Sequence, residues 1–322
     1  MNGLLKNIAV ALACIIAGTA SAQDTYPSRT IRILVGFQAG GSVDLTARIV
    51  AEHLAPLLGT PVVVENKLGA SGLIAAAEVA RAAPDGYTLF MANLGSSALA
   101  PNIQPKLPFD PVNDFTAVGQ IASVSYLASI PASIPPNNLQ EFIAWAKQRG
   151  DVPYASAGVG ATGHMNGELL NQTVGLTLRH VPYKGAPQAI TELIGGQTFL
   201  YVDPTSVLKP HVKSGKLKAL YITSAARDPE LPDVPTVREL GYPDLETSGW
   251  QGLVGPKGLP ESVVTRLYTE LHKVLAMPEV RDRLQAAGQP VKERSPAEFA
   301  AFIKSENERA VSIITKAKMR NE

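Results

Sequence analysis

The chain has 322 residues, with 29 Lys and Arg against 28 Asp and Glu, and a single cysteine. This near balance of charge predicts no basic face and argues against a nucleic-acid-binding protein, and one cysteine cannot form a disulfide within the chain. The length allows a large buried core and favours two lobes over one.

The N-terminal segment has the pattern of an export signal. Lys6 precedes an apolar run over residues 8–17, and Ala20-Ser21-Ala22 supplies the small residues of a cleavage site. We therefore predict a signal peptide over residues 1–22 and an exported mature chain that begins at Gln23. Cleavage removes Lys6 and the only cysteine, so 28 basic side chains remain beside 28 acidic ones.

A lipoprotein signal is the alternative reading of this segment, because Leu12-Ala13 precedes Cys14. That pattern is weak here, since Cys14 lies in the middle of the apolar run and Ala11 occupies a position where a bulky aliphatic residue is expected. After residue 22, no stretch is long and apolar enough to cross a bilayer.

Strand-like and helix-like segments alternate along the mature chain. The first block has predicted strands at 31–35, 62–64 and 87–91, and helices at 45–58 and up to Arg81. This alternation predicts a mostly parallel sheet with helices on both faces. The Pro-rich stretch 101–111 is expected to be an ordered excursion.

A second block begins near Ser125. Its predicted strands are 127–130, 152–155, 178–181, 199–202 and 218–223, and its predicted helices run to Arg149, from His164, over 187–194 and over 206–214. Asn138 and Glu141 resemble a capping pair for the first of these helices. A strand at 249–254 then leads into three terminal helices, two of which are expected to begin at Pro278 and Pro296.

The segment Gly36 to Arg48, GFQAGGSVDLTAR, follows a strand and opens a helix. Gly40 and Gly41 allow the backbone to approach a ligand closely, Ser42 is a candidate N-cap, and Asp44 lies in the first helical turn. The first N–H groups of a helix have no internal partner, and the helix dipole adds positive charge there. The segment therefore predicts an anion site, with an ordinary strand–helix turn as the alternative.

A second glycine loop spans Ser156 to Gly163. Gly158, Gly160 and Gly163 form GxGxxG, but Tyr183 and Lys184 stand where a dinucleotide fold needs an acidic residue. The loop is therefore not expected to bind a dinucleotide. It is expected to expose backbone N–H groups between a strand and a helix, with Thr162 adding a hydroxyl and His164 at the helix start.

Two charged residues follow strands in the second block. Lys184 is either a solvated lysine on a turn or a cleft residue whose cation attracts anions. Asp203 either caps the helix at 206–214 or accepts a hydrogen bond from a ligand hydroxyl, a ligand amine or a bridging water. Its position at the carboxyl end of a strand favours the ligand.

The sequence gives no sign of a metal, haem or catalytic site. The histidines are far apart in sequence, at His53, His164, His180, His211 and His272. No GxSxG is present, since Ser71 lies in Gly-Ala-Ser-Gly. We therefore expect no cofactor and no enzymatic activity, with a Ser-His-Asp triad assembled in space as the alternative.

Residues 40–48 resemble the GGxxDxxAR signature of the Bug (TctC-type) extracytoplasmic solute receptors, the binding proteins of tripartite tricarboxylate transporters. The similarity covers essentially the whole mature chain. It includes Pro84-Asp85-Gly86-Tyr87-Thr88-Leu89, Val181-Pro182-Tyr183-Lys184-Gly185, Gly195-Gly196-Gln197, Leu231-Pro232-Asp233-Val234-Pro235-Thr236 and Trp250-Gln251-Gly252-Leu253.

The resemblance implies an α/β fold like that of type II periplasmic binding proteins, with two lobes around a cleft and C-terminal helices. Domain 1 would comprise residues 23–125 and 248–322, and domain 2 residues 126–247. In this family a ligand carboxylate is held between two strand–helix loops by backbone N–H groups, small hydroxyls and ordered water.

The two loops map onto Phe37 to Asp44 and Ser156 to His164, with a third wall at 93–97. The implied ligand-binding residues are Phe37, Gly40, Gly41, Ser42, Asp44, Asn93, Ser96, Ser156, Gly158, Gly160, Thr162, His164 and Asp203. The chain departs from the family at Ala161, where members often carry Ser or Thr, and Thr162 would replace the lost hydroxyl.

The resemblance implies a monomeric receptor in the periplasm of a Gram-negative bacterium. This receptor captures a small carboxylate and delivers it to the membrane subunits of a tripartite tricarboxylate transporter. Two alternatives stay open: a solute sensor that acts on a membrane sensor kinase, and an exported hydrolase. The sequence does not identify the carboxylate.

Overall fold

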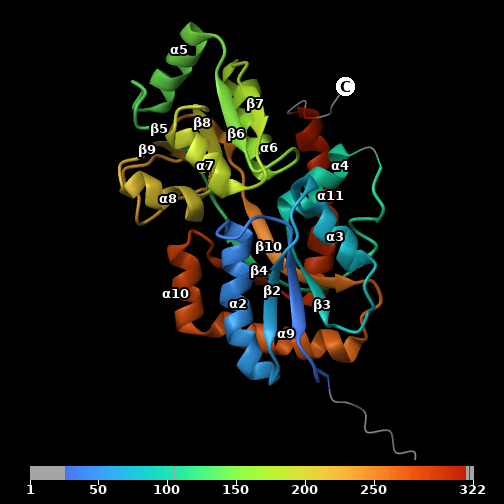
Figure 1. Ribbon diagram of the computed structural model, residues 1–322. Coiled ribbons are helices and arrows are strands. Elements are labelled where there is room, and N and C mark those ends of the chain that lie inside the picture. The colour runs from blue at the N-terminus through green and yellow to red at the C-terminus, as the bar shows by residue number, and fades with distance from the viewer. Residues whose placement is uncertain (1–25, 105, 317–318, 320–322) are drawn as a thin grey trace, which may run out of the picture.

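The computed structural model describes residues 26–104, 106–316 and 319. The predicted signal peptide, with Cys14, lies outside these residues. The described chain forms two α/β lobes, each built on its own sheet and stacked one above the other (Figure 1). The predicted fold class is confirmed.

The first lobe is built on a six-stranded sheet in the order β11-β4-β10-β3-β1-β2. β1 is parallel to β2 and β3, whereas β10 is antiparallel to β3 and β4, and β11 is antiparallel to β4. The strands are β1 (Ile31–Val35), β2 (Val62–Asn66), β3 (Thr88–Asn93), β4 (Phe115–Val124), β10 (Gly249–Pro256) and β11 (Val291–Arg294).

The second lobe is built on a five-stranded sheet in the order β7-β6-β8-β5-β9. β6 is parallel to β7 and β8, and β5 is antiparallel to β8 and β9. The strands are β5 (Tyr126–Pro131), β6 (Pro153–Ser156), β7 (Arg179–Pro182), β8 (Leu200–Pro204) and β9 (Leu217–Ile222).

The prediction of a mostly parallel sheet is wrong, because each sheet is mixed. Parallel neighbours need a crossover connection, usually a helix. β5 instead follows β4 directly, with Ser125 between them, and β10 returns from the second lobe. Strands that pass straight from one sheet to the other are free to pair antiparallel. β4 and β11 were not predicted as strands.

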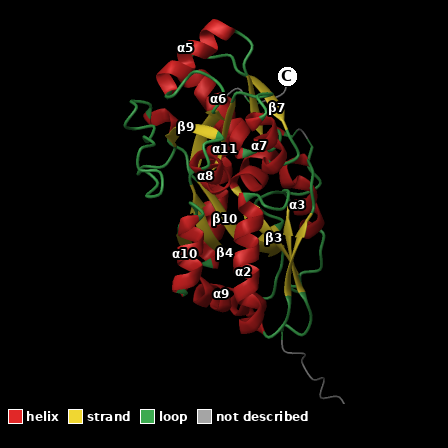
Figure 2. Cartoon of the chain, turned by 60° about the vertical axis from the view of Figure 1, so that its left-hand side comes forward, coloured by secondary structure: helices red, strands yellow, loops and turns green. Residues whose placement is uncertain are grey.

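Helices cover both faces of each sheet, as predicted. In the first lobe α2, α9 and α10 cover one face and α3 and α11 the other, and in the second lobe α7 and α8 lie opposite α5 and α6 (Figure 2). These helices are α2 (Ser42–Leu58), α3 (Leu73–Ala80), α5 (Leu139–Arg149), α6 (Thr162–Val174), α7 (Ala186–Ile194), α8 (Thr205–Lys213), α9 (Glu261–Ala276), α10 (Pro278–Ala286) and α11 (Pro296–Lys316).

Shorter helical segments connect these elements. They are η1 (Ala70–Gly72), the π-helical η2 (Gly95–Leu99), α4 (Ala100–Ile103) and η3 (Pro243–Leu245). The predicted starts at Pro278 and Pro296 are confirmed. Residues alternate between the faces of a strand, so Ile33 of β1 packs towards α2 while Leu34 packs towards α3.

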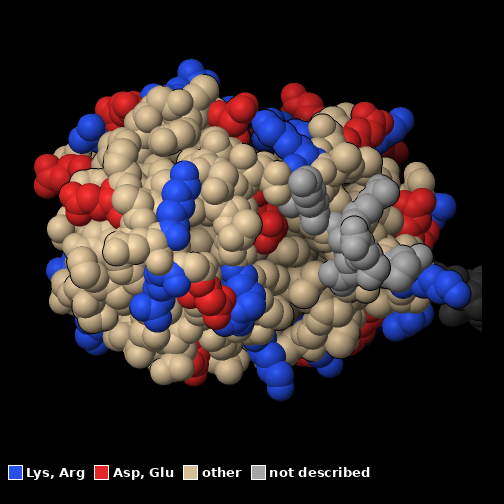
Figure 3. Space-filling model, turned by 90° about the horizontal axis from the view of Figure 1, so that it is seen from above, with Lys and Arg blue, Asp and Glu red and all other residues tan. Residues whose placement is uncertain are grey.

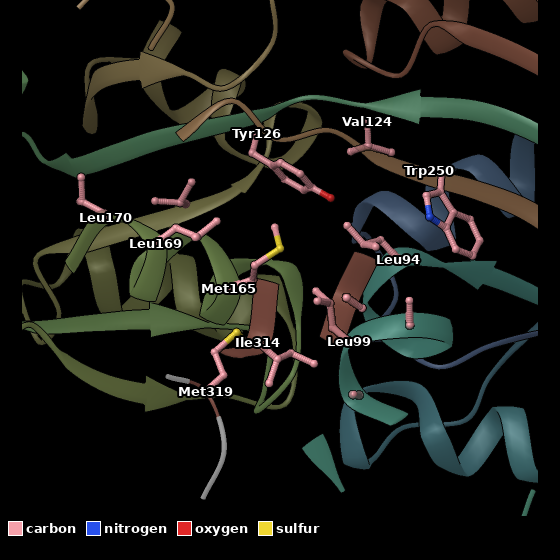
Figure 4. Packing of buried hydrophobic residues seen from close by; sticks show 14 of the residues in the cluster. Leu94, Leu99, Val124, Tyr126, Met165, Leu169, Leu170, Trp250, Ile314 and Met319 are labelled. Atoms are coloured by element: carbon pink, nitrogen blue, oxygen red, sulfur yellow. The ribbon is translucent and has the colours of Figure 1, made fainter. Parts of the chain in front are cut away.

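One apolar cluster continues from the first lobe into the second. Leu94 and Leu99 belong to the first lobe, Met165 to α6 and Ile314 to α11, and Figure 4 shows them around Tyr126 of β5. α11 therefore contributes to the packing of both lobes.

The side chain of Thr223, which follows β9, links the two segments that cross between the lobes. The Tyr126 N–H donates to Thr223 Oγ1 at 3.1 Å, and Thr223 Oγ1 donates to the Thr247 carbonyl at 2.8 Å. The Tyr126 hydroxyl lies against Gly249, at a point where the Cβ of any other residue would collide with it.

Charged side chains of both signs are interspersed over the face seen in Figure 3. This pattern agrees with the nearly balanced charge of the sequence. Within the part of the chain that the structure describes, no helix combines the length and apolar character needed to span a bilayer.

The capping pair predicted for α5 provides a stability test. The Glu141 N–H donates to Asn138 Oδ1 at 2.9 Å, and Asn138 Nδ2 donates to Glu141 Oε1 at 2.7 Å. We expect Asn138→Ala to lower the free energy of unfolding by about 1 kcal/mol, measured by urea denaturation. Asn138→Ser keeps a capping oxygen and should stay close to the wild type, and equal losses in both variants would contradict this role for the cap.

Candidate functional site

The first glycine loop joins β1 to α2 and presents the start of that helix. Gly41 is the N-cap, so the prediction of Ser42 as N-cap is wrong by one residue. The Ser42 hydroxyl instead accepts a hydrogen bond from Gln251 Nε2 at 2.8 Å. Because a helix leaves its first N–H groups without internal partners, those of Ser42 and Val43 are available to a ligand.

Asp44 holds this loop in place. Its carboxylate accepts hydrogen bonds from the Gly40 N–H at 3.0 Å, from Arg48 Nε at 2.9 Å and from Asn66 Nδ2 at 2.9 Å. Burial opposes ionisation, but the hydrogen bonds from Arg48, Gly40 and Asn66 outweigh it and hold the pKa of Asp44 below its usual value. Asp44 is therefore a charged support for the helix start, and Gly40 accommodates the tight turn with φ +82°.

The second glycine loop joins β6 to α6 and presents another helix start. Ala161 is the N-cap and Thr162 the first helical residue. Within the loop, the Gly158 N–H donates to Ser156 Oγ at 3.1 Å, and Ser156 Oγ donates to the Gly158 carbonyl at 3.0 Å. The loop is thus hydrogen-bonded to the end of its own strand.

A stacked pair of histidines supports this second loop. The rings of His164 and His180 are 4.0 Å apart and nearly parallel. His164 Nδ1 accepts a hydrogen bond from the Gly160 N–H at 3.2 Å, and His180 Nε2 lies 2.6 Å from Ser156 Oγ. Burial lowers the pKa of His164 to about 4, and burial together with the neighbouring His164 lowers the pKa of His180 to about 3. Both rings are therefore neutral at pH 7.

The sequence spacing did not reveal His180 as part of the site. His180 is brought to the loop by the parallel register of β6 and β7, in which it pairs with Tyr154. The contact between His180 and Ser156 resembles that between a catalytic serine and its general base. However, Ser156 is fully buried and its hydroxyl is already hydrogen-bonded to Gly158. The low pKa of His180 also makes it a poor base at neutral pH, so the pair is a brace for the loop.

A small, partly open space between the lobes, here called the cleft cavity, has a volume of about 50 Å³. The starts of α2, α6 and α7 reach it, and β8 ends at it. Six of the predicted site residues line it, namely Phe37, Gly41, Ser42, Asn93, Thr162 and Asp203. Six further lining residues were not predicted as ligand contacts, namely Gln38, Val43, Ala157, Ala161, Ala186 and Pro204.

The remaining predicted residues lie around the cleft cavity and not on its wall. Asp44, Ser156 and His164 support the two loops as described above. Ser96 accepts a hydrogen bond at its hydroxyl from Asn93 Nδ2 at 2.9 Å, and its N–H donates to Asn93 Oδ1 at 3.2 Å. Gly40 borders a separate groove between α7 and α8, and Gly158 and Gly160 face the opposite lobe.

Asp203 is the last residue but one of β8 and lines the cleft cavity. It is 4% exposed, and α8 has no side-chain cap, so Asp203 is not a helix cap. Burial raises the pKa of Asp203 to about 7. The Tyr201 hydroxyl offsets part of this rise, although it makes no well-aligned hydrogen bond with the carboxyl.

The two lobes meet through small residues beside the cleft cavity. Ser71 Oγ donates to the Val159 carbonyl at 2.5 Å. A Cβ on Gly160 would lie 2.7 Å from Ala100 Cα, and one on Gly185 would lie 2.7 Å from Gln38 Cβ. Any side chain at these two glycines would therefore keep the lobes apart.

A larger hollow of about 570 Å³, here called the side hollow, adjoins the cleft cavity and shares Phe37 and Ala157 with it. Its wall also includes Ser71, Tyr183 and Lys184. Lys184 therefore lies at the side hollow and not in the cleft cavity. Among residues 26–104, 106–316 and 319, no group of three or more His, Cys, Asp or Glu side chains is arranged to hold a metal ion.

Protonation of the histidine pair is expected to destabilise the fold. The folded-state pKa values of His164 and His180 lie below the value of about 6.5 for an unfolded chain, so the unfolded state binds more protons below that pH. Their contribution to stability is fully present above pH 6.5 and decreases as the pH falls towards 4. We expect His180→Asn to show a smaller drop in melting temperature between pH 7 and pH 4.5 than the wild type.

Asp203 has the opposite dependence, because its folded-state pKa is raised and the folded state binds its proton more readily. This contribution is common to the wild type and His180→Asn and cancels in the comparison. His272→Asn removes an exposed histidine of α9 that pairs with Glu293 at 2.8 Å, so it should not reduce the drop and serves as the control. Equal drops in the wild type and His180→Asn would exclude the buried pair as the source.

The chain matches known proteins along most of its length. A family model for the tripartite tricarboxylate transporter family receptor matches residues 46–319. The UPF0065 protein in the TAR-I ttuE-ttuC' intergenic region of Agrobacterium vitis is 38% identical over 315 residues, which cover 96% of this chain and 91% of that protein.

Solved structures agree with this match. The periplasmic binding protein BugD is 36% identical with a TM-score of 0.88, covering 92% of this chain and 100% of that one. MatC from Rhodopseudomonas palustris with bound malate is 35% identical with a TM-score of 0.85, covering 90% of this chain and 100% of that one. The chain therefore belongs to the tripartite tricarboxylate transporter receptor (TctC) family of solute-binding receptors, which includes the Bug proteins.

Proposed function

We propose that this receptor captures a small carboxylate between its two lobes in the periplasm and delivers it to the membrane subunits of a tripartite tricarboxylate-type transporter. One observation supports a carboxylate as the ligand. The start of α2 from one lobe and the starts of α6 and α7 from the other all line the cleft cavity. Each helix start offers N–H donors and partial positive charge.

The cleft cavity can bind an anion through the dipoles of helix starts and hydroxyl groups, without a charged side chain. Of the described residues that line it, none is Lys or Arg. A carboxylate would instead accept hydrogen bonds from the N–H groups of Ser42 and Thr162 and from their hydroxyls. Charge-assisted hydrogen bonds of this kind contribute about 1.5–3 kcal/mol each before desolvation is subtracted. The malate in MatC is a precedent for a carboxylate ligand in a relative.

Ligand binding is proposed to stabilise the closed arrangement of the lobes. The donors come from both lobes, so a carboxylate gains all of its hydrogen bonds only when α2 and α6 face each other. A ligand shifts the balance between open and closed states by its differential affinity for the two. The membrane partner would recognise the closed arrangement.

The processing and domain limits predicted from the sequence are part of the proposal. Residues 1–22 are a cleaved signal peptide, the mature chain is a monomer, and the domains are 23–125 with 248–322 and 126–247. In support, the chain passes from one sheet to the other between Val124 and Tyr126 and again between Ile222 and Gly249. A sensor that acts on a membrane kinase would use the same cavity, and identification of the membrane partner separates it from transport.

Ligand binding should be visible as thermal stabilisation. The mature protein, unfolded and refolded to remove carried ligand, would be screened against mono-, di- and tricarboxylates, aromatic acids and amino acids. A ligand at about 1,000 times its dissociation constant adds about 4 kcal/mol, so the midpoint should rise by several degrees. Gly41→Val places a branched side chain in the cavity and should abolish the shift. If no carboxylate raises the unfolding midpoint of the well-folded wild type, the carboxylate proposal is wrong.

Lobe closure can be tested with a matched pair of glycines. Gly160 and Gly175 both have positive φ values, +79° and +66°, but a Cβ on Gly160 would meet Ala100 of the other lobe, whereas a Cβ on Gly175 would meet nothing within 4 Å. Alanine at either site should cost a similar 1–2 kcal/mol or so of stability from the backbone. We expect only Gly160→Ala to weaken carboxylate binding, by roughly tenfold or more. Equal affinities in the two variants would contradict the closure mechanism.

A further inference from the structure

Asp203 is the only acidic side chain among the described residues that line the cleft cavity. It is 96% buried, no salt bridge with a cation of the described chain reaches it, and the Tyr201 hydroxyl beside it lowers its pKa without a well-aligned hydrogen bond. A buried carboxylate without a partner is costly, because its charge has lost water and gained no compensating group. Its neighbours on β8 do not supply that compensation, since the Tyr201 hydroxyl is itself without a well-aligned partner.

A second acceptor in the same cavity has no partner. Gln38 Oε1 is buried and accepts no hydrogen bond. Because an amide can turn and present either its oxygen or its nitrogen, Gln38 adjusts to the ligand, whereas an ionised Asp203 can only accept. With a pKa raised to about 7, Asp203 is partly protonated at neutral pH, and a ligand group that brings hydrogen-bond donors and positive charge would favour its ionised form.

The cleft cavity thus has two ends of opposite character. The starts of α2 and α6 supply donors and partial positive charge, and the end of β8 supplies a carboxylate. A second carboxylate on the ligand would be repelled at Asp203 unless one of the two took up a proton. An ammonium group would instead neutralise Asp203 and donate up to three hydrogen bonds.

We infer that the carboxylate bound by this receptor carries an ammonium group, so that the ligand is an amino acid whose ammonium group binds Asp203. This inference rests on the proposed function as a carboxylate receptor. The cleft cavity is small, but the side hollow shares Phe37 and Ala157 with it, so a ligand side chain has room in that direction.

The test compares ligands that share one skeleton and differ at one group. Aspartate, malate and succinate carry an ammonium, a hydroxyl and a hydrogen at the same carbon, and alanine, lactate and propionate form a second such series. Affinities would be measured by titration calorimetry on the exported protein after unfolding and refolding. We expect the amino member of at least one series to bind roughly 10- to 100-fold more tightly than the other two, the range that one buried charge-assisted hydrogen bond produces.

Two substitutions test whether the preference for the amino acid depends on Asp203. Asp203→Asn keeps the size of the side chain but loses the charge, and it should reduce the preference for the amino member to within a few-fold. Asp282→Asn makes the same change at an exposed position on α10 and should keep the preference. If Asp203→Asn does not fold, the wild-type series still decides the question.

Each outcome has a definite meaning. Tighter binding of malate, succinate, lactate or propionate than of the matched amino acids would overturn the inference and leave the proposed function intact. An unchanged preference in Asp203→Asn would also overturn it. Failure of every carboxylate to bind a well-folded wild type would overturn the proposed function itself.

Discussion

The unsatisfied N–H groups at helix starts are the constraint on which the site depends. A helix cannot bond its own first donors, and here α2 and α6 place those donors at one small cavity from opposite lobes. The donors are part of the backbone, so their positions follow from the loops that precede each helix. This explains why so much of the surrounding chemistry holds loops in place and does not contact the cavity.

The two loops are held by different physical means. In the first, the ionised Asp44 collects hydrogen bonds from Gly40, Arg48 and Asn66. In the second, the neutral rings of His164 and His180 hold the backbone through Gly160 and Ser156. Asp44 is buried, but its charge is compensated by these donors, and the histidine rings carry no charge at neutral pH, so neither brace leaves an uncompensated charge next to the ligand.

The sequence could predict what depends on local pattern. Apolar periodicity located most strands and helices. The glycine loops and the end of the strand before Asp203 identified five of the twelve residues of the cavity wall, and the family resemblance added Asn93. It could not predict features that depend on strand register or lobe contact. His180 reaches Ser156 through the pairing of β6 and β7, and Gln38 and Ala186 reach the cavity only because Gly185 lets the lobes touch. β4 and β10 are antiparallel because they cross between lobes, which no local pattern records.

The shared apolar core and the polar cavity have complementary roles in closure. Ile314 of α11 packs with Met165 of α6 in a cluster that also contains Phe299, so the second lobe is attached to the helical tail of the first. Apolar burial has no preferred direction, whereas hydrogen bonds at the cavity do. The core can therefore hold the lobes together over a range of orientations, while the cavity favours one. A ligand then favours the closed orientation by forming hydrogen bonds with the few polar groups of the cleft cavity. Because Asp203 is one of these groups, the stability of the closed state depends on the hydrogen-bond donors that the ligand carries.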